Sequence, residues 1–413
     1  MSNFSRRKLL FGLGGFGGGL LGARLLVPGL LSTKPRLSLT PRLRKFVAQC
    51  FEGLERDKLW DTHAHLLGVG AGGTGCEINP DMIKIWNPFK RLQYDVYTRV
   101  GGIDELKSAD QDFLEKLLSL HRNANPQGKL ILLGFDRFVD EKGVEVPEHT
   151  PFYVPNEYVF DVVSKNKDTL GCASIHPYRN DAVQRLDEAV ENGAVAIKWL
   201  PNAMGIDPAS ELCDSFYDRL VHHQLPLITH AGNEQAVDSR HLDSLGNPLR
   251  LRRPLDRGVK IIIAHMASFG TDDDLEAPSK AEASSFDLAL RLFDDPNYQQ
   301  NLFADISALT FLNRDAETIR TILRREDLHS RLVNGSDYPL LGIDILVSTR
   351  WLVYHDLIAE KDRESLNELF EINPLLFDFA VKRTLRDRQS TRTYKLSASV
   401  FETARVFERP GSS

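Results

Sequence analysis

Two histidines separated by one residue, His63 and His65, end the first strand-like segment of the chain. In an extended strand, side chains two residues apart point to the same side. Two imidazoles on one side of a strand end can bind a metal ion. On its own the pair is weak evidence, because histidines this close also arise by chance or serve as ordinary polar residues. Its meaning therefore depends on the rest of the chain.

Other residues of similar chemistry follow later apolar segments. Each stands at or near the carboxyl end of a segment that is typical of a β-strand, where it could hold a cation or move a proton. Taken singly, a histidine at a strand end is more often a satisfied polar residue than a ligand, and an aspartate there could cap a following helix. The residues are His230, His265, Lys198 and Asp337.

These segments belong to a repeating pattern. After residue 56, short apolar or β-branched runs alternate with amphipathic stretches, which indicates βα units around a parallel sheet. We expect strands at residues 59–63, 130–135, 170–175, 195–200, 226–230, 260–265, 302–306 and 332–336. We expect helices between them at residues 181–192, 208–224, 280–293 and 314–325. Eight such units predict an α/β fold, a (β/α)8 TIM barrel, whose closure brings all strand ends to one mouth.

The barrel is expected to occupy residues 57–380, which is more than the roughly 250 residues typical of this fold. Most of the excess is an insertion after the first strand, residues 66–128, with a Gly-rich loop, an aromatic segment at 86–97 and a helix near 110–122. A long connection on this side of a barrel could be a lid or specificity element, or a packing decoration. Residues 36–56 form a lead-in segment.

Beyond the barrel we expect a C-terminal helical extension, from residue 374 to 386, and then a tail. The tail is residues 381–413 and includes the end of that helix. After the helix the tail has no helical or strand periodicity, and we expect it to wrap the surface. We interpret its basic stretch, residues 382–395, as a solvated face.

The first 35 residues do not have the pattern of a folded domain. Arg6 and Arg7 precede a glycine-rich, weakly apolar stretch, which is typical of a twin-arginine export signal, although a flexible tail is the alternative. We expect export by the twin-arginine route to the periplasm, or anchoring on the periplasmic side of the membrane. Cleavage stays open, because a longer apolar segment could serve as an uncleaved anchor.

Composition narrows the class of partner. The chain has 413 residues, a net charge of −6 and a pI near 6.1, which argues against nucleic acid as the main partner. Four cysteines are too few for a disulfide framework or a Cys-rich zinc module, although one bridge stays open. We expect a small-molecule substrate.

The ordered set of motifs resembles the amidohydrolase superfamily. It runs from Asp61-Thr62-His63-Ala64-His65, through histidines after the fifth and sixth strands, to a Gly-Ser-Asp-Tyr-Pro turn after the eighth. The resemblance extends to about Phe379 and is strongest to the amidohydrolase-related branch that includes aminocarboxymuconate-semialdehyde decarboxylase. It implies an enzyme with one or two divalent ions, and imidazole with carboxylate ligands favours zinc.

The resemblance also implies roles for individual residues. His63, His65 and His230 would hold the ion together with Asp337, which would also take a proton from the activated water. His265 would polarise the substrate carbonyl and shuttle protons, or bind a second ion.

Lys198 bears on the number of ions. In two-metal relatives a lysine on the fourth strand is carboxylated and bridges the ions, whereas many single-metal relatives have the lysine without carboxylation. Burial would supply the neutral amine that carboxylation requires. Lys198 could instead pair with a carboxylate such as Asp337, so one ion and two ions are equally open.

Polar residues after other expected strands could contact the substrate. Arg179 could hold a substrate carboxylate through two parallel hydrogen bonds. His176, Trp199 and Asn202 could line the same mouth, although a structural role in its loop is the favoured alternative for each of the four. Asp305, on the seventh strand, is ambiguous. Related barrels are often dimers, so a homodimer is an expectation by family analogy alone.

Three functions agree with these residues. The leading hypothesis is metal-dependent hydrolysis of an amide, ester, lactone or related bond in a small molecule. The first alternative is metal-dependent, non-oxidative decarboxylation of an unsaturated or aromatic acid. The second is a non-catalytic, metal-containing protein of the cell envelope. A metal site with a purely structural role prefers a closed coordination shell, which argues against this second alternative.

Overall fold

The computed structural model describes residues 39–80, 100–103, 105–124, 128–233, 237 and 241–408. The expected export signal at residues 1–35 and the aromatic segment at 86–97 lie outside the described residues. Among the helices described, none is long and apolar enough to cross a membrane. The four cysteines, all buried, are free.

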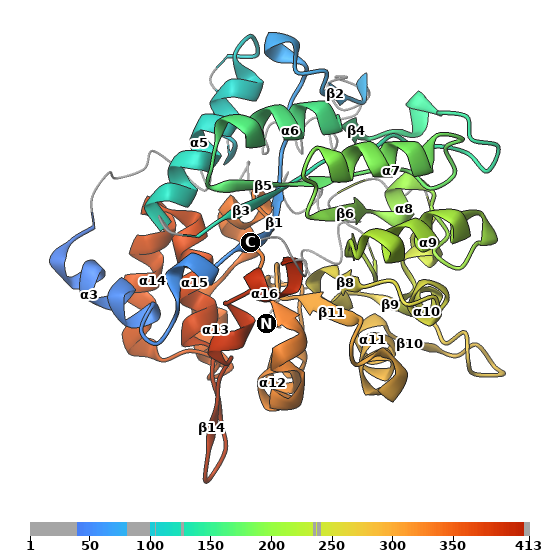
Figure 1. Ribbon diagram of the computed structural model, residues 1–413. Helices are drawn as coiled ribbons and strands as arrows, with labels where there is room; N and C mark the ends of the chain where they lie inside the picture. The colour runs from blue at the N-terminus through green and yellow to red at the C-terminus, as the bar shows by residue number, and fades with distance from the viewer. Residues whose placement is uncertain are drawn as a thin grey trace, which may run out of the picture.

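Eight parallel strands form one sheet that curls into a barrel, as the sequence predicts (Figure 1). The chain order of the strands is also their order around the barrel, so each strand is joined to the next one around the barrel by a βα connection. Backbone hydrogen bonds from Thr62 N–H to the Asn334 carbonyl (3.1 Å) and from Asp337 N–H to the His63 carbonyl (2.7 Å) close the ring. The strands are β1 (Asp61–His65), β3 (Leu130–Leu133), β5 (Thr169–Ala173), β6 (Ala196–Trp199), β7 (Leu227–Thr229), β8 (Ile261–Ile263), β11 (Leu302–Asp305) and β12 (Leu332–Val333).

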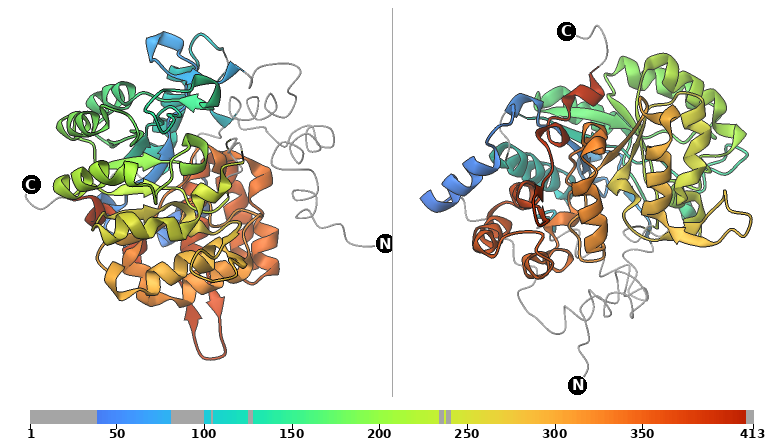
Figure 2. Two further views of the ribbon diagram at one scale, coloured as in Figure 1. Left: turned by 90° about the vertical axis from the view of Figure 1, so that its right-hand side faces the viewer. Right: turned by 90° about the horizontal axis from the view of Figure 1, so that it is seen from below.

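Helices surround the strands on the outside (Figures 1 and 2). The predicted helices are confirmed, with two shortened at their beginnings by local capping. The segment at 208–224 becomes a helix only from Asp214, after a short 3₁₀ turn, and the segment at 280–293 begins as a strand until Ser284 caps the helix through its side chain. The outer helices are α5 (Ala109–Ala124), α6 (Asn156–Lys165), α7 (Ala182–Glu191), α8 (Pro201–Met204), α9 (Asp214–His223), α10 (Arg252–Asp256), α11 (Ser285–Asp294) and α12 (Ala316–Arg324).

The remaining elements lie outside the repeating βα pattern. The lead-in helix α3 and the helix α14 both pack against α15 beside the barrel, and α15 also contacts α5. Short antiparallel pairs β2–β4, β9–β10 and β13–β14 decorate the connections. Their bounds are α3 (Pro41–Cys50), α13 (Thr349–Tyr354), α14 (Glu360–Ile372), α15 (Pro374–Thr384), α16 (Ala404–Phe407), β2 (Glu77–Ile78), β4 (Phe152–Tyr153), β9 (Thr271–Asp273), β10 (Glu282–Ser284), β13 (Asp387–Arg388) and β14 (Thr393–Tyr394).

The inside of the barrel is apolar at its amino-terminal end. One residue or two from each of six strands form a buried cluster there, and Val406 and Phe407 of α16 complete it. The tail therefore differs from our expectation: its β13–β14 hairpin lies outside, as Figure 1 shows, but its last described helix packs under the barrel. The cluster residues on the strands are Ile131, Leu133, Cys172, Ala196, Ile228, Ile262 and Val333.

Candidate metal centre and active site

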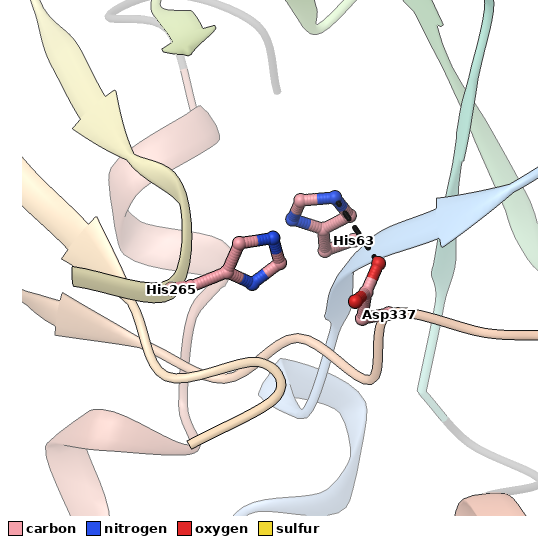
Figure 3. Close-up of side chains that lie close together, drawn as sticks. All are labelled: His63, His265 and Asp337. Carbon is pink, nitrogen blue, oxygen red and sulfur yellow. Dashed lines mark ion pairs between the residues drawn. The ribbon is translucent and has the colours of Figure 1, made fainter. Parts of the chain in front are cut away.

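Three side chains that could bind a metal ion meet at the carboxyl ends of strands β1, β8 and β12. His63 lies in β1, His265 follows β8 by two residues, and Asp337 follows β12 by four. One ligand atom from each lies within 4.8 Å of the other two, and all three residues are buried. Figure 3 shows both imidazoles and the carboxylate turned toward a common space. The convergence predicted from the sequence therefore occurs for these three residues.

The other predicted ligands surround this group. Asp337 Oδ1 lies 3.3 Å from Nε2 of His65 and 3.7 Å from Nε2 of His63. The ring centroids of His63 and His265 are 5.0 Å apart, and those of His230 and His265 are 5.5 Å apart. All five residues that we expected around a cation thus lie in one cluster.

Lys198 reaches the same cluster from β6. It lies two residues after Ala196, whose side chain faces the barrel interior, so strand alternation directs Lys198 inward as well. Its Nζ is 3.2 Å from Nε2 of His63, and its side chain is almost completely buried. The lysine is thus placed beside the candidate ligands, as the sequence predicts, and its carboxylation stays a prediction.

The segments that carry His265 and Asp337 have an unusual backbone. His265, Met266 and Ala267 have φ angles of 54°, 49° and 47°, and Asp337 has a φ of 60°. Non-glycine residues rarely adopt this left-handed conformation, which costs about 1–3 kcal/mol each and concentrates at functional sites. Strain at two of the three converging segments supports a functional role for this mouth of the barrel.

A glycine brings the Asp337 segment close to β1. At Gly335, an added Cβ would come within 2.6 Å of the His63 Cβ, so no larger residue fits without movement. The close approach lets the segment pair with β1 and places Asp337 next to both β1 histidines.

Asp305 is the site residue that the sequence left ambiguous. Its Oδ2 lies 2.9 Å from Nδ1 of His63, and its Oδ1 accepts from the backbone N–H of His265 at 2.9 Å. Histidine ligands of metals commonly have such a carboxylate behind the ring. One signal was present in the sequence, because Asp305 lies one residue before the end of the seventh expected strand, 302–306, close to the place that the other site residues have on theirs.

Burial decides the charge of the histidines. It lowers the pKa of His63 to about 4 and that of His265 well below its usual value. Burial opposes ionisation of Asp337 and Asp305, but the histidines beside them hold the pKa of each carboxyl below its usual range. Near neutral pH the imidazoles of His63 and His265 are therefore neutral and the carboxylates of Asp305 and Asp337 are ionised, which is the state that binds a divalent cation.

The four predicted substrate residues are not among the three converging side chains, and each has a partner elsewhere in the described part of the chain. Trp199 alternates with Lys198 and so faces outward, where its ring packs on Phe216 and Tyr217 of α9. His176 is buried and donates from Nε2 to the Met204 carbonyl.

Arg179 and Asn202 also have partners within the chain. The Arg179 guanidinium forms ion pairs with Asp136 and Glu145, and Asn202 donates to the Gly232 carbonyl at 3.2 Å. These contacts give both residues a structural role in the connections around the mouth. Substrate binding by the four residues stays a prediction.

Comparison with known proteins gives structural similarities only. No family model matches the chain, and no curated protein matches it. A structure described as "probable 2-pyrone-4,6-dicarboxylic acid hydrolase" from Acinetobacter baumannii is 13% identical, with a TM-score of 0.42 over 78% of this chain and 99% of that one. The 2,6-dihydroxybenzoate decarboxylase from Rhizobium is 14% identical, with a TM-score of 0.39 over 62% and 88%.

A third similar structure is that of 4-oxalomesaconate hydratase from Rhodopseudomonas palustris. It is 13% identical to this chain, with a TM-score of 0.40 over 78% of this chain and 98% of that one. What these proteins act on is a property of those proteins. In this chain itself, the eight-stranded parallel barrel and the convergence at its carboxyl end are those that the amidohydrolase resemblance implies.

Proposed function

We propose that this chain is a metal-dependent hydrolase of the amidohydrolase type, which cleaves an amide, ester, lactone or related bond in a small molecule. The observation that carries the proposal is the meeting of His63, His265 and Asp337 at the ends of strands far apart in the sequence. In a (β/α)8 barrel, active sites lie at this face. The strained backbone beside two of these residues supports the same location.

The donor set suits a divalent ion such as zinc. Neutral imidazoles and carboxylate are preferred zinc ligands, and a catalytic zinc site keeps a coordination position open for water or substrate. When bound, the ion supplies Lewis acidity, which polarises a substrate carbonyl and makes water more acidic. The assigned ligands are His63, His65, His230 and Asp337, with His265 for a second ion and Lys198 if carboxylated.

Asp337 is the residue placed to move the proton in hydrolysis. Its carboxylate is ionised and lies among the candidate ligands, so it can accept a proton from the attacking water. The water oxygen adds to the substrate carbonyl carbon, the bond to the nitrogen or oxygen of the leaving group breaks, and Asp337 returns the proton to that group. His265, whose ring centroid lies 5.0 Å from that of His63, offers a second proton acceptor.

The test measures where the oxygen of water goes. The full chain, stripped of ions with a chelator and reloaded with Zn²⁺ or Mn²⁺, is assayed against lactones, esters and amides in water enriched in ¹⁸O. Hydrolysis predicts one labelled oxygen in the acid product, loss of turnover on ion removal and recovery on reloading. We expect Asp337→Asn to lower kcat by about 10²- to 10⁴-fold.

Matched variants and a second panel of substrates, unsaturated and aromatic acids, separate hydrolysis from decarboxylation and from a non-catalytic role. His63→Ala should weaken Zn²⁺ binding, whereas His222→Ala, at an exposed histidine of α9, should leave it unchanged. Release of CO2 from unsaturated or aromatic acids, with no ¹⁸O in the organic product, would mean that the reaction is decarboxylation and not hydrolysis. Tight ion binding without turnover on either panel, with loss of folding in His63→Ala, would support the non-catalytic envelope protein.

A further inference from the structure

A buried carboxylate lies directly behind the candidate site and contacts both segments that carry site histidines. Asp305 is the last residue of β11, and its side chain is completely buried. Its Oδ2 is 2.9 Å from Nδ1 of His63. Its Oδ1 accepts from the backbone N–H of His265 at 2.9 Å and from that of Ser307 at 3.0 Å.

The chemistry of the partners decides where the histidine protons lie. An ionised carboxylate only accepts hydrogen bonds, so the contact with Asp305 requires the proton of His63 on Nδ1. The Ser307 hydroxyl donates to Asp305 Oδ1, so its oxygen is left to accept from Nδ1 of His265, 2.7 Å away. The Ser307 carbonyl oxygen, 3.3 Å from the same nitrogen, also only accepts. Both histidines therefore carry their proton on Nδ1.

We infer that Asp305 is a positioning residue that fixes the tautomer of both histidines, directly at His63 and through Ser307 at His265. With the proton on Nδ1, each ring keeps the lone pair of Nε2 for a metal ion or a proton. For His63 that nitrogen faces the site, 3.7 Å from Asp337 Oδ1 and 3.2 Å from Lys198 Nζ. The consequence for ion binding rests on the proposed function, whereas the tautomers are a property of the ion-free chain.

Substituting the carboxylate by an amide gives opposite predictions for the two histidines. In Asp305→Asn, the amide oxygen must occupy the Oδ1 position, because three donors converge there: two backbone N–H groups and the Ser307 hydroxyl. The amide NH2 then faces Nδ1 of His63, which must become an acceptor. We expect His63 to change to the Nε2–H tautomer while His265 keeps its proton on Nδ1.

Ser307→Ala should have the complementary effect. It removes the hydroxyl, which lies 2.7 Å from Nδ1 of His265 and 3.4 Å from Nδ1 of His63. Asp305 still contacts Nδ1 of His63 at the shorter distance of 2.9 Å, so His63 should stay in the Nδ1–H tautomer. His265 retains only the longer contact with the carbonyl of residue 307, and we expect a mixture of its two tautomers. Each variant thus contains one histidine that serves as an internal control.

The experiment is long-range ¹H–¹⁵N correlation spectroscopy of the full, metal-free chain labelled with [¹⁵N]histidine. His63→Gln and His265→Gln assign the two rings by loss of their signals. A Zn²⁺ titration against a chromophoric chelator then measures affinity, and we expect Asp305→Asn to weaken binding about 10- to 100-fold. The matched control is Asp272→Asn, which replaces another buried aspartate that accepts from a serine hydroxyl, Ser285, at 2.7 Å.

Several results would overturn the inference. An Nε2–H signal from either histidine in the unsubstituted chain would do so, as would an unchanged His63 tautomer in folded Asp305→Asn. If Asp305→Asn does not fold, Ser307→Ala decides, since a pure Nδ1–H tautomer at His265 would remove the role of the serine. If the unsubstituted chain binds no Zn²⁺, the proposed function fails, but the tautomers still test the inference.

Discussion

His176 is a buried, neutral imidazole whose two nitrogens both have partners. Its Nε2 donates to the Met204 carbonyl at 3.0 Å, and its Nδ1 accepts from the Tyr178 N–H at 3.2 Å. Burial lowers the pKa of His176 from 6.5 to about 4. Because the unfolded chain then binds the proton first, this contribution to stability is complete above pH 6.5 and is lost as the pH falls toward 4. At about 1.4 kcal/mol per pKa unit, the loss amounts to about 3 kcal/mol.

Chemical denaturation of the metal-free chain between pH 7 and 4.5 measures this contribution. We expect His176→Gln to be less stable than the unsubstituted chain at pH 7 but to lose less stability on acidification. The control is His222→Gln, because His222 is exposed and should leave the pH dependence unchanged. Parallel curves for His176→Gln and the unsubstituted chain would show that His176 does not titrate on unfolding.

At the same scale, the sequence predicts the site residues unevenly. Histidines and aspartates at strand ends could be found because a closed barrel brings those ends together. Neighbouring residues of one strand were harder to separate, since Lys198 and Trp199 face opposite sides and only the register decides which side is inside. Asp305 stayed ambiguous because its partners come from β1 and from the segment after β8, which only the closed barrel brings to it.

At the scale of elements, α15 holds the segment that carries Asp337. Lys382 on this helix is completely buried, and its Nζ donates to the Gly335 carbonyl at 2.7 Å and to Asp378 at 2.6 Å. Our expectation of a solvated basic stretch is therefore wrong at Lys382, because helical spacing places it over Asp378 on the inner face. Lys382→Met leaves a buried carboxylate without its cation, and we expect a loss of about 3–5 kcal/mol in the free energy of unfolding.

Urea denaturation and a double-mutant cycle test this ion pair. Lys382→Met with Asp378→Leu should recover much of the loss, because both charged groups are then absent. Asp161 and Lys165 provide a matched control, since they have the same spacing and an Nζ–Oδ2 distance of 2.7 Å on an exposed helix surface. Lys165→Met should change stability by only about 0.3–0.5 kcal/mol. Additive effects of the two buried substitutions would contradict the proposed coupling.

At the scale of the whole molecule, the sequence predicts the barrel better than it predicts the packing of the C-terminal tail against the amino end of the barrel. The βα alternation indicates eight units, and eight strands leave few other arrangements. The docking of the tail had no comparable signal, because α16 is one helical turn long and its apolar residues show no periodicity. Its position depends on the apolar cluster at the amino end of the barrel, whose residues come together only after the strands have paired.

Phe407 is the residue through which the tail should contribute most to stability. It is buried in the cluster at the base of the barrel, with its ring centroid 6.2 Å from that of Trp60, and Thr403 ties the same segment to the Trp60 carbonyl. We expect Phe407→Ala to lower the free energy of unfolding by about 3–5 kcal/mol, through lost burial and the cavity that remains. Tyr354→Ala, at a largely exposed aromatic residue, should change it by about 0.5 kcal/mol or less.

The base and the candidate site lie at opposite ends of the strands, so the two should respond differently. Phe407→Ala should bind Zn²⁺ with nearly unchanged affinity at temperatures where it stays folded, because it touches none of the converging side chains. Thermal unfolding and the chelator titration on the same samples measure both quantities. Equal stability of the Phe407 and Tyr354 variants would mean that the tail does not seal the barrel. A large loss of Zn²⁺ affinity without a loss of stability would mean that the base is coupled to the site through the strands themselves.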